Sequence, residues 1–173
     1  YNTLAEGKHS FSVKAVDKAG NETKNIPTYN WIIPMQFKRT EIGSLHSCSI
    51  SKGDSLFCWG SNSVGQLGDT TSQDRAVPKI LKSENRWQEL SLGKYHSCAT
   101  GGMKPEEKRL YCWGSNGKGQ LGNGNYSSRA KPDEVSGKFT DWVKVASSTH
   151  HTCGIRSMNG TNRLFCWGGN DNG

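Results

Sequence analysis

The sequence is poor in apolar residues and contains no long apolar run. Only 32% of its 173 residues are hydrophobic, and no stretch of 18 apolar residues occurs, so no membrane span is predicted. Proline is scarce, with 5 residues, whereas glycine is abundant, with 21. No long segment combines helical periodicity with capping residues. We therefore expect short strands and many turns, which is an all-β protein.

The sequence also lacks the residue patterns of catalysis. No glycine-rich segment has the strand, helix and lysine of a phosphate-binding loop, and no serine or cysteine lies in a nucleophile elbow. His150 and His151 accompany Asp141, but no nucleophile goes with them. The acidic and amide residues at 17, 21 and 170–172 do not complete a calcium loop. We predict no enzymatic activity, no cofactor and no metal site.

The charge balance is basic but not concentrated. The chain has 22 Lys and Arg against 15 Asp and Glu, a net charge of +7. These residues are scattered, and no basic arm or basic helical stripe is present. The composition favours a soluble basic surface and no specific binding of nucleic acid, with weak attraction to anionic partners.

One short string occurs three times along the chain. Cys58-Trp59-Gly60-Ser61-Asn62 recurs at 112–116 and, with Gly for the Ser, at 166–170, each time 54 residues later. Further matches flank it: a His-Ser/Thr-Cys string at 46–48, 96–98 and 151–153, an aromatic residue nine positions before each His, and Gly-Gln-Leu-Gly at 65–68 and 119–122. The chain therefore contains an internal repeat.

Each repeat reads as a set of short strands. Residues 87–92 alternate, residues 96–100 and 110–113 follow as further strands, and Asn and Gly residues then supply a tight turn. The segments 69–86 and 123–138 between the repeats vary in sequence. Four-stranded units of this length, repeated, are typical of propeller blades.

The strings His-Ser-Cys and Leu-Phe-Cys-Trp-Gly-Ser-Asn-x-x-Gly-Gln-Leu-Gly resemble the regulator of chromosome condensation repeat. The resemblance covers residues 35–173 and implies about three blades of a seven-bladed β-propeller, with repeats at about 37–86, 87–141 and 142–173, the last truncated. Members of that family bind protein partners through rim loops. They include a nuclear exchange factor, a plant ultraviolet receptor and a secreted bacterial inhibitor of β-lactamases, so the fold alone fixes no function.

The six cysteines depart from the eukaryotic pattern of this family. They fall in the two middle strands of each blade, where opposed residues have the Cβ separation of a disulfide. We therefore predict the pairs Cys48–Cys58, Cys98–Cys112 and Cys153–Cys166. Zinc is the alternative, with His46, His96 and His151 as added ligands, but no fourth ligand recurs. The family has this His without Cys, so we expect it to form hydrogen bonds within the blade.

Residues 1–34 lie outside the repeat. Residues 9–16 and 29–33 alternate around a turn signal at 17–21, and the segment resembles the closing hairpin of a bacterial immunoglobulin-like surface domain. Such a hairpin does not fold alone. We expect the chain to be part of a longer protein; several copies completing one ring are the alternative.

Loops of varying length join the cysteine-bearing strands, at 51–55, 101–109 and 156–163. They are candidate partner-binding loops, with basic candidates at Lys52, Lys104, Lys108, Arg109, Arg156 and Arg163. Disulfides place the protein outside the cytoplasm, secreted or on the cell surface. We predict a bacterial recognition or adhesion module that binds a protein or glycan. The alternatives are a self-assembling structural subunit, which forms a homo-oligomer, and a secreted enzyme inhibitor.

Overall fold

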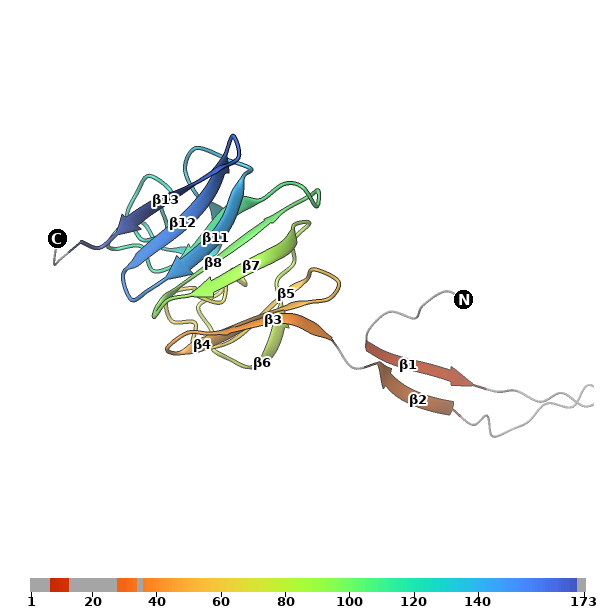
Figure 1. The fold of residues 1–173 in the computed structure, drawn as a ribbon. Coiled ribbons are helices and arrows are strands. Elements are labelled where there is room, and N and C mark those ends of the chain that lie inside the picture. Colours follow the sequence, from red (N-terminus) through yellow and green to blue (C-terminus); the bar gives the residue numbers. More distant parts are fainter. Residues whose placement is uncertain (1–6, 13–27, 34–35, 171–173) are drawn as a thin grey trace, which may run out of the picture. The chain divides into compact units, whose positions relative to one another are not determined.

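The computed structural model describes residues 7–12, 28–33 and 36–170, and the chain divides into two compact units, Tyr1–Gln36 and Phe37–Gly173. All regular structure in these residues is β (Figure 1), which confirms the predicted fold class. Within the described residues, no helix is long and apolar enough to cross a membrane.

The first unit contains one antiparallel pair of strands. Strand β1 (Gly7–Ser12) pairs with β2 (Thr28–Ile33), in a register that places Gly7 opposite Ile33 and Ser12 opposite Thr28. The predicted turn at 17–21 lies outside the described residues. The immunoglobulin-like assignment of this unit stays a prediction.

The second unit contains three antiparallel sheets, one for each sequence repeat, which we call blades 1 to 3. Blade 1 comprises β3 (Phe37–Ile42), β4 (His46–Ser51), β5 (Leu56–Gly60) and β6 (Arg75–Ile80). Blade 2 comprises β7 (Arg86–Leu92), β8 (His96–Gly102), β9 (Arg109–Gly114) and β10 (Arg129–Glu134). Blade 3 comprises β11 (Trp142–Ser147), β12 (His151–Met158) and β13 (Thr161–Gly168).

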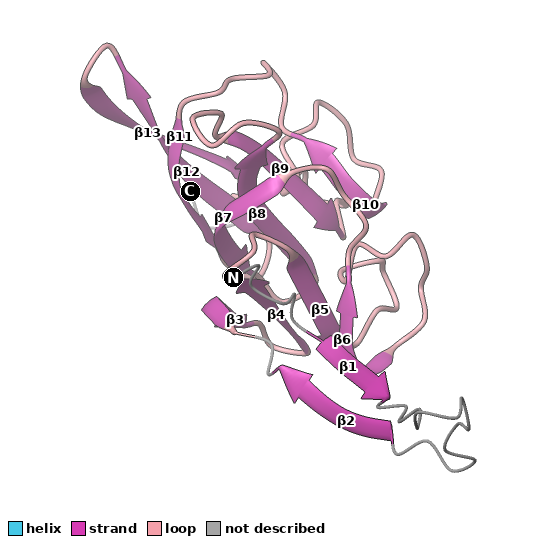
Figure 2. Cartoon of the chain, turned by 90° about the vertical axis from the view of Figure 1, so that its right-hand side faces the viewer, coloured by secondary structure: helices cyan, strands magenta, loops and turns pink. Residues whose placement is uncertain are grey.

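The blades stack face to face in chain order. Strand β4 contacts β7, and β8 contacts β11, and Figure 2 shows the strands of the three blades. The buried apolar side chains form clusters between two blades. The core between blades 1 and 2 includes Ile50, Leu56, Trp87 and Trp113. The core between blades 2 and 3 is centred on Leu110 and Trp142. Burial of these apolar side chains is what holds neighbouring blades together.

The fourth strands of blades 1 and 2 are β6 and β10. They lie in the segments 69–86 and 123–138, which were predicted only as variable connections between the repeats. Strands β6 and β10 are edge strands that pair with β5 and β9, with a register shift in each ladder. Pro78 and Pro132 lie in these irregular stretches. An edge strand tolerates proline because one side of it needs no hydrogen-bond donor, and the matching Arg-Ala-x-Pro strings at 75–78 and 129–132 were the signal for it.

Each blade has one disulfide between directly opposed residues of its two middle strands. Cys48 faces Cys58, Cys98 faces Cys112, and Cys153 faces Cys166, with Cα atoms 4.1 Å apart in every pair. These are the three pairs expected from the sequence. No free cysteine is present among the described residues.

Candidate functional site: the loop rim and the blade junctions

The loop between β4 and β5 ties blade 1 to blade 2. The main-chain carbonyl of Asp54 accepts a hydrogen bond from the amide of Trp87 at 3.0 Å. Its carboxylate pairs with Lys38 and, at 2.9 Å, with Arg86. Burial alone would raise the pKa of Asp54, but the hydrogen bonds from Lys38 and Arg86 outweigh it and lower the pKa below its usual value. Part of this loop is therefore structural.

The loop between β8 and β9 likewise connects blade 2 to blade 3. The amide of Lys108 donates to the carbonyl of Thr140, and the carbonyl of Lys108 accepts from the amide of Trp142, both at 3.0 Å. Arg109 begins β9, and its guanidinium pairs with Glu134 at 2.9 Å. The Arg109 charge is thus balanced within its own blade, whereas the side chain of Lys108 extends from a loop whose backbone is held.

Arg156 was predicted to lie in a loop, and this prediction is wrong. It belongs to β12, because the hairpin turns only at Asn159 and Gly160. The residue is 8% exposed. Two of its nitrogens pair with Asp141 at 2.7 and 3.1 Å, and its guanidinium carbon lies 3.3 Å from the centre of the Phe139 ring. A buried, paired and stacked arginine packs the blade and is not available to a partner.

Arg163 is likewise in a strand, β13, opposite Arg156, but it is exposed. Lys52 and Lys104 are exposed loop residues, and Lys108 is half-buried. Within the described residues, none of these four side chains forms an ion pair. The unneutralised candidates are therefore Lys52, Lys104, Lys108 and Arg163, each on the hairpin that joins the two middle strands of its blade.

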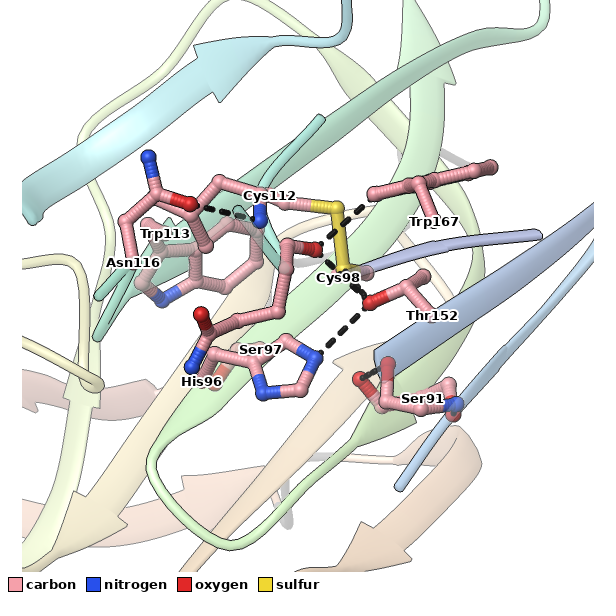
Figure 3. The surroundings of a disulfide bond; sticks show 12 residues. Ser91, His96, Ser97, Cys98, Cys112, Trp113, Asn116, Thr152 and Trp167 are labelled. Atoms are coloured by element: carbon pink, nitrogen blue, oxygen red, sulfur yellow. Dashed lines mark hydrogen bonds between the residues drawn. A yellow bond between two sulfur atoms is a disulfide. The ribbon is translucent and has the colours of Figure 1, made fainter. Parts of the chain in front are cut away.

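The repeated His, Ser/Thr, Gln and Trp residues form a hydrogen-bonded relay between blades. At the junction of blades 2 and 3, His96 Nε2 lies 2.8 Å from Thr152 Oγ1, and the Thr152 hydroxyl donates to the carbonyl of Gln120 at 2.8 Å. The indole N–H of Trp167 donates to the same carbonyl at 3.0 Å. Figure 3 shows His96, Thr152 and Trp167 around the Cys98–Cys112 disulfide. The expectation that the His bonds within its own blade is wrong, since its partner lies on the next blade.

The same relay joins blades 1 and 2. His46 Nε2 lies 2.8 Å from Ser97 Oγ, the Ser97 hydroxyl donates to the carbonyl of Gln66 at 2.7 Å, and Trp113 Nε1 donates to that carbonyl at 2.9 Å. Glycine at 68 permits this approach, because a Cβ there would lie 2.7 Å from the indole nitrogen. All these positions recur in the sequence repeats and could be identified from them. The repeats do not indicate on which blade each hydrogen-bond partner lies.

Counting protons assigns the tautomer of both histidines. The hydroxyls of Ser97 and Thr152 each have one proton, which they donate in a hydrogen bond to the main-chain carbonyl of a glutamine. Each hydroxyl can therefore only accept a hydrogen bond from the imidazole. His46 and His96 are therefore Nε2–H tautomers, and their buried Nδ1 atoms have no hydrogen-bond partner in the described structure. Burial lowers the pKa of both residues to about 4, so they are neutral at neutral pH.

The zinc alternative would need thiolates and these same imidazoles as ligands. The structure instead joins the cysteines in disulfides and engages His46 and His96 in the relay. Among the described residues, no group of three or more His, Cys, Asp and Glu is arranged to hold a metal ion.

Repeated antiparallel sheets of three or four strands, packed face to face through such relays, define the chain as part of a β-propeller. Models of the regulator of chromosome condensation (RCC1) repeat match residues 38–66, 54–100 and 107–155. The chain belongs to the RCC1 repeat family.

The chain is similar to several larger proteins. It is 30% identical to the probable E3 ubiquitin-protein ligase HERC4 of Mus musculus over 142 residues, which are 80% of the chain and 13% of HERC4. It is 32% identical to the ultraviolet-B receptor UVR8 of Arabidopsis thaliana over 136 residues, which are 76% of the chain and 29% of UVR8. The chain thus spans less than a third of either relative.

Solved structures show the same fold. Yeast RCC1 (Prp20), crystallised with Kap60, matches with a TM-score of 0.61 at 20% identity, over 77% of the chain and 32% of that protein. Human WBSCR16 matches with a TM-score of 0.66 at 15% identity, over 88% of the chain and 37% of that protein.

Proposed function

We propose that this chain is a non-enzymatic recognition module of a bacterial secreted or cell-surface protein, and that it binds an acidic surface of another protein. The observation that carries this proposal is the set of unneutralised cations on the hairpins between middle strands: Lys52, Lys104, Lys108 and Arg163. The loop backbones that carry Lys52, Lys104 and Lys108 are already tied to the next blade, and Arg163 lies in a strand, so binding costs little ordering of these segments.

Extracellular localisation is part of this proposal. Three disulfides in one chain of this size are the usual sign of an oxidising compartment. The relatives support a role in protein binding in one respect, since yeast RCC1 was crystallised bound to Kap60. That partner belongs to yeast RCC1 and is not carried over to this chain.

We also propose that residues 1–34 close a bacterial immunoglobulin-like domain and that residues 35–173 form propeller repeats. The antiparallel pairing of β1 with β2 supports a hairpin of that kind. If the two parts are separate domains, a chain lacking residues 1–34 should unfold at the same temperature as the full chain, measured by circular dichroism. A lower unfolding temperature for the shortened chain would contradict the proposed boundary.

Binding is tested with the fluorescently labelled chain on a panel of intact bacterial and epithelial cells. We expect the variant Lys104→Ser/Lys108→Ser to bind with a several-fold lower association rate at low salt, and the difference to fade at high salt because exposed charges are screened. The control variant Lys79→Ser/Lys131→Ser removes the same charge from the outer strands β6 and β10 and should bind like the unchanged chain.

Treating the cells beforehand identifies the class of partner. Loss of binding after trypsin supports a protein partner. Loss after glycosidases with resistance to trypsin would identify a glycan and overturn the proposed partner class. Equal binding of both double variants at low salt would overturn the role of the rim cations.

A further inference from the structure

One group of charged side chains at the junction of blades 1 and 2 contains more positive than negative charge. Lys38 of β3 and Arg86 of β7 both pair with the carboxylate of Asp54, and we call these three residues the Asp54 cluster. Lys38 contacts Oδ1 of the carboxylate, whereas Nε and Nη2 of Arg86 contact Oδ2 at 3.0 and 2.9 Å. Two cations thus share one carboxylate, and no other acid of the described residues pairs with either of them.

The equivalent site at the junction of blades 2 and 3 pairs one acid with one cation. Asp141 lies directly before the repeated tryptophan, at the position of Arg86. Lys108 lies at the position of Asp54, since the carbonyl of each accepts a hydrogen bond from the amide of that tryptophan. Both carboxylate oxygens of Asp141 pair with the buried guanidinium of Arg156. One carboxylate and one cation are therefore enough to hold a junction, and the second cation of the Asp54 cluster is not needed for packing.

The cations are the outer members of the Asp54 cluster. The side chain of Arg86 is 56% exposed and that of Lys38 is 35% exposed, whereas that of Asp54 is 17% exposed. The carboxylate therefore lies beneath the two positive groups and neutralises only one of them. The cluster presents a positive charge to solvent, which attracts an anion.

The backbone fixes the position of the central carboxylate. The amide of Asp54 donates to the carbonyl of Ser51, and the carbonyl of Asp54 accepts from the amide of Trp87, both at 3.0 Å. The fixed carboxylate in turn orients the guanidinium of Arg86 through its Nε and Nη2 atoms. The other edge of that guanidinium, formed by Nη1 and Nη2, has the donor spacing that binds both oxygens of a second carboxylate. Within the described structure, no protein group accepts a hydrogen bond from Nη1.

We propose that the Asp54 cluster binds one carboxylate of the partner, with Arg86 as its bidentate donor and Lys38 beside it. The inference rests on the proposed function for the acidity of the partner, and it adds the residue that anchors that partner. The surplus of one positive charge matches a carboxylate, which is a monoanion, whereas a phosphate monoester carries close to two negative charges. Arg86 was not among the basic residues selected from the sequence, because it precedes a strand tryptophan and lies in no hairpin loop.

The test is the binding of a fluorescein-labelled hexaglutamate peptide to the chain, measured by fluorescence anisotropy at low salt. Arg86→Gln keeps an N–H donor for Asp54 but removes the charge, and it should raise the dissociation constant about fivefold. Arg86→Lys keeps the charge without the bidentate edge, so its dissociation constant should lie between the two. Arg129→Gln is the matched control. Arg129 pairs one to one with Asp133 and lies opposite Gly114, at the end of blade 2 away from the hairpin loops.

Circular dichroism establishes that each variant is folded before it is compared. No binding of the peptide, unchanged binding by Arg86→Gln, or an equal loss in Arg129→Gln would overturn the proposal. Arg86→Lys binding like the unchanged chain would overturn the bidentate contact.

Two further comparisons separate the alternatives. Tighter binding of a triphosphoserine peptide than of hexaglutamate would identify phosphate as the ligand and overturn the carboxylate. A chain that binds the peptide through Arg86 but does not bind cells would overturn the proposed function alone. Cell binding that depends on Lys104 and Lys108, together with peptide binding that is unchanged in Arg86→Gln, would overturn this inference alone.

Discussion

The imidazole N–H of His96 donates to the hydroxyl of Thr152 across the junction of blades 2 and 3, at 2.8 Å. That hydroxyl in turn donates a hydrogen bond to the main-chain carbonyl of Gln120, also at 2.8 Å. One threonine of strand β12 in blade 3 thus connects two parts of blade 2, the middle strand β8 and the loop between β9 and β10.

Replacing Thr152 with Val should destabilise the protein by about 1 to 3 kcal/mol, because valine leaves the buried N–H of His96 without an acceptor. The free energy of unfolding is measured by urea denaturation. Thr149→Val, in the exposed turn before β12, is the matched control and should change stability by less than about 0.5 kcal/mol. Equal effects of the two substitutions would contradict the relay.

Stability should fall as the pH is lowered from about 6.5 to 4. His46 and His96 have a pKa of about 4 when folded and about 6.5 when unfolded. Between these values the unfolded chain binds more protons, so acidification favours unfolding, by up to about 3 kcal/mol for each histidine. The free energy of unfolding at a series of pH values measures this slope.

The double variant His46→Gln/His96→Gln retains an N–H donor at each relay but does not titrate. It should lose the slope between pH 4 and 6.5 and keep the loss of stability below pH 4, where Asp54 and Asp69, whose pKa values are lowered, take up protons. His150→Gln, at an exposed residue, should retain the full slope. A slope that survives the double variant would contradict the histidine assignment.

The three disulfides should differ in their resistance to reduction. The cysteines of blades 1 and 2 are fully buried, whereas Cys166 is exposed and Cys153 is half-buried. Graded reduction followed by alkylation and peptide mapping should label Cys153 and Cys166 first, because exchange requires access to the sulfur. First labelling at Cys98 or Cys112 would contradict the blade packing.

Replacing both Cys98 and Cys112 with Ser should lower the free energy of unfolding by about 2 to 4 kcal/mol.

The sequence predicted the blades well because each blade repeats the same local pattern. The Cys-Trp-Gly strings located the third strands, and the alternating residues 87–92 located a first strand. The outer strands β6 and β10 were missed because their residues are polar, exposed and interrupted by Pro78 and Pro132, which weakens every local strand signal.

The site was only partly predictable, because the charge that a side chain presents depends on contacts between blades. Arg156 and Lys108 looked alike in the sequence as basic residues near a hairpin. Only packing against Phe139 and Asp141 distinguishes the first as a buried structural residue. The inter-blade partner of each histidine likewise depends on how the sheets stack, which a repeat in the sequence does not specify.

The central claim is that the repeated residues hold the blades together while the cations of the hairpin rim bind the partner. The most direct measurement compares Thr152→Val with Lys104→Ser/Lys108→Ser for both urea stability and low-salt binding of the labelled chain to intact cells. The account predicts that the threonine variant loses stability but, when folded, binds normally, and that the lysine variant keeps its stability but binds severalfold more slowly. Loss of binding in the folded threonine variant, or unchanged binding in the lysine variant, would contradict it.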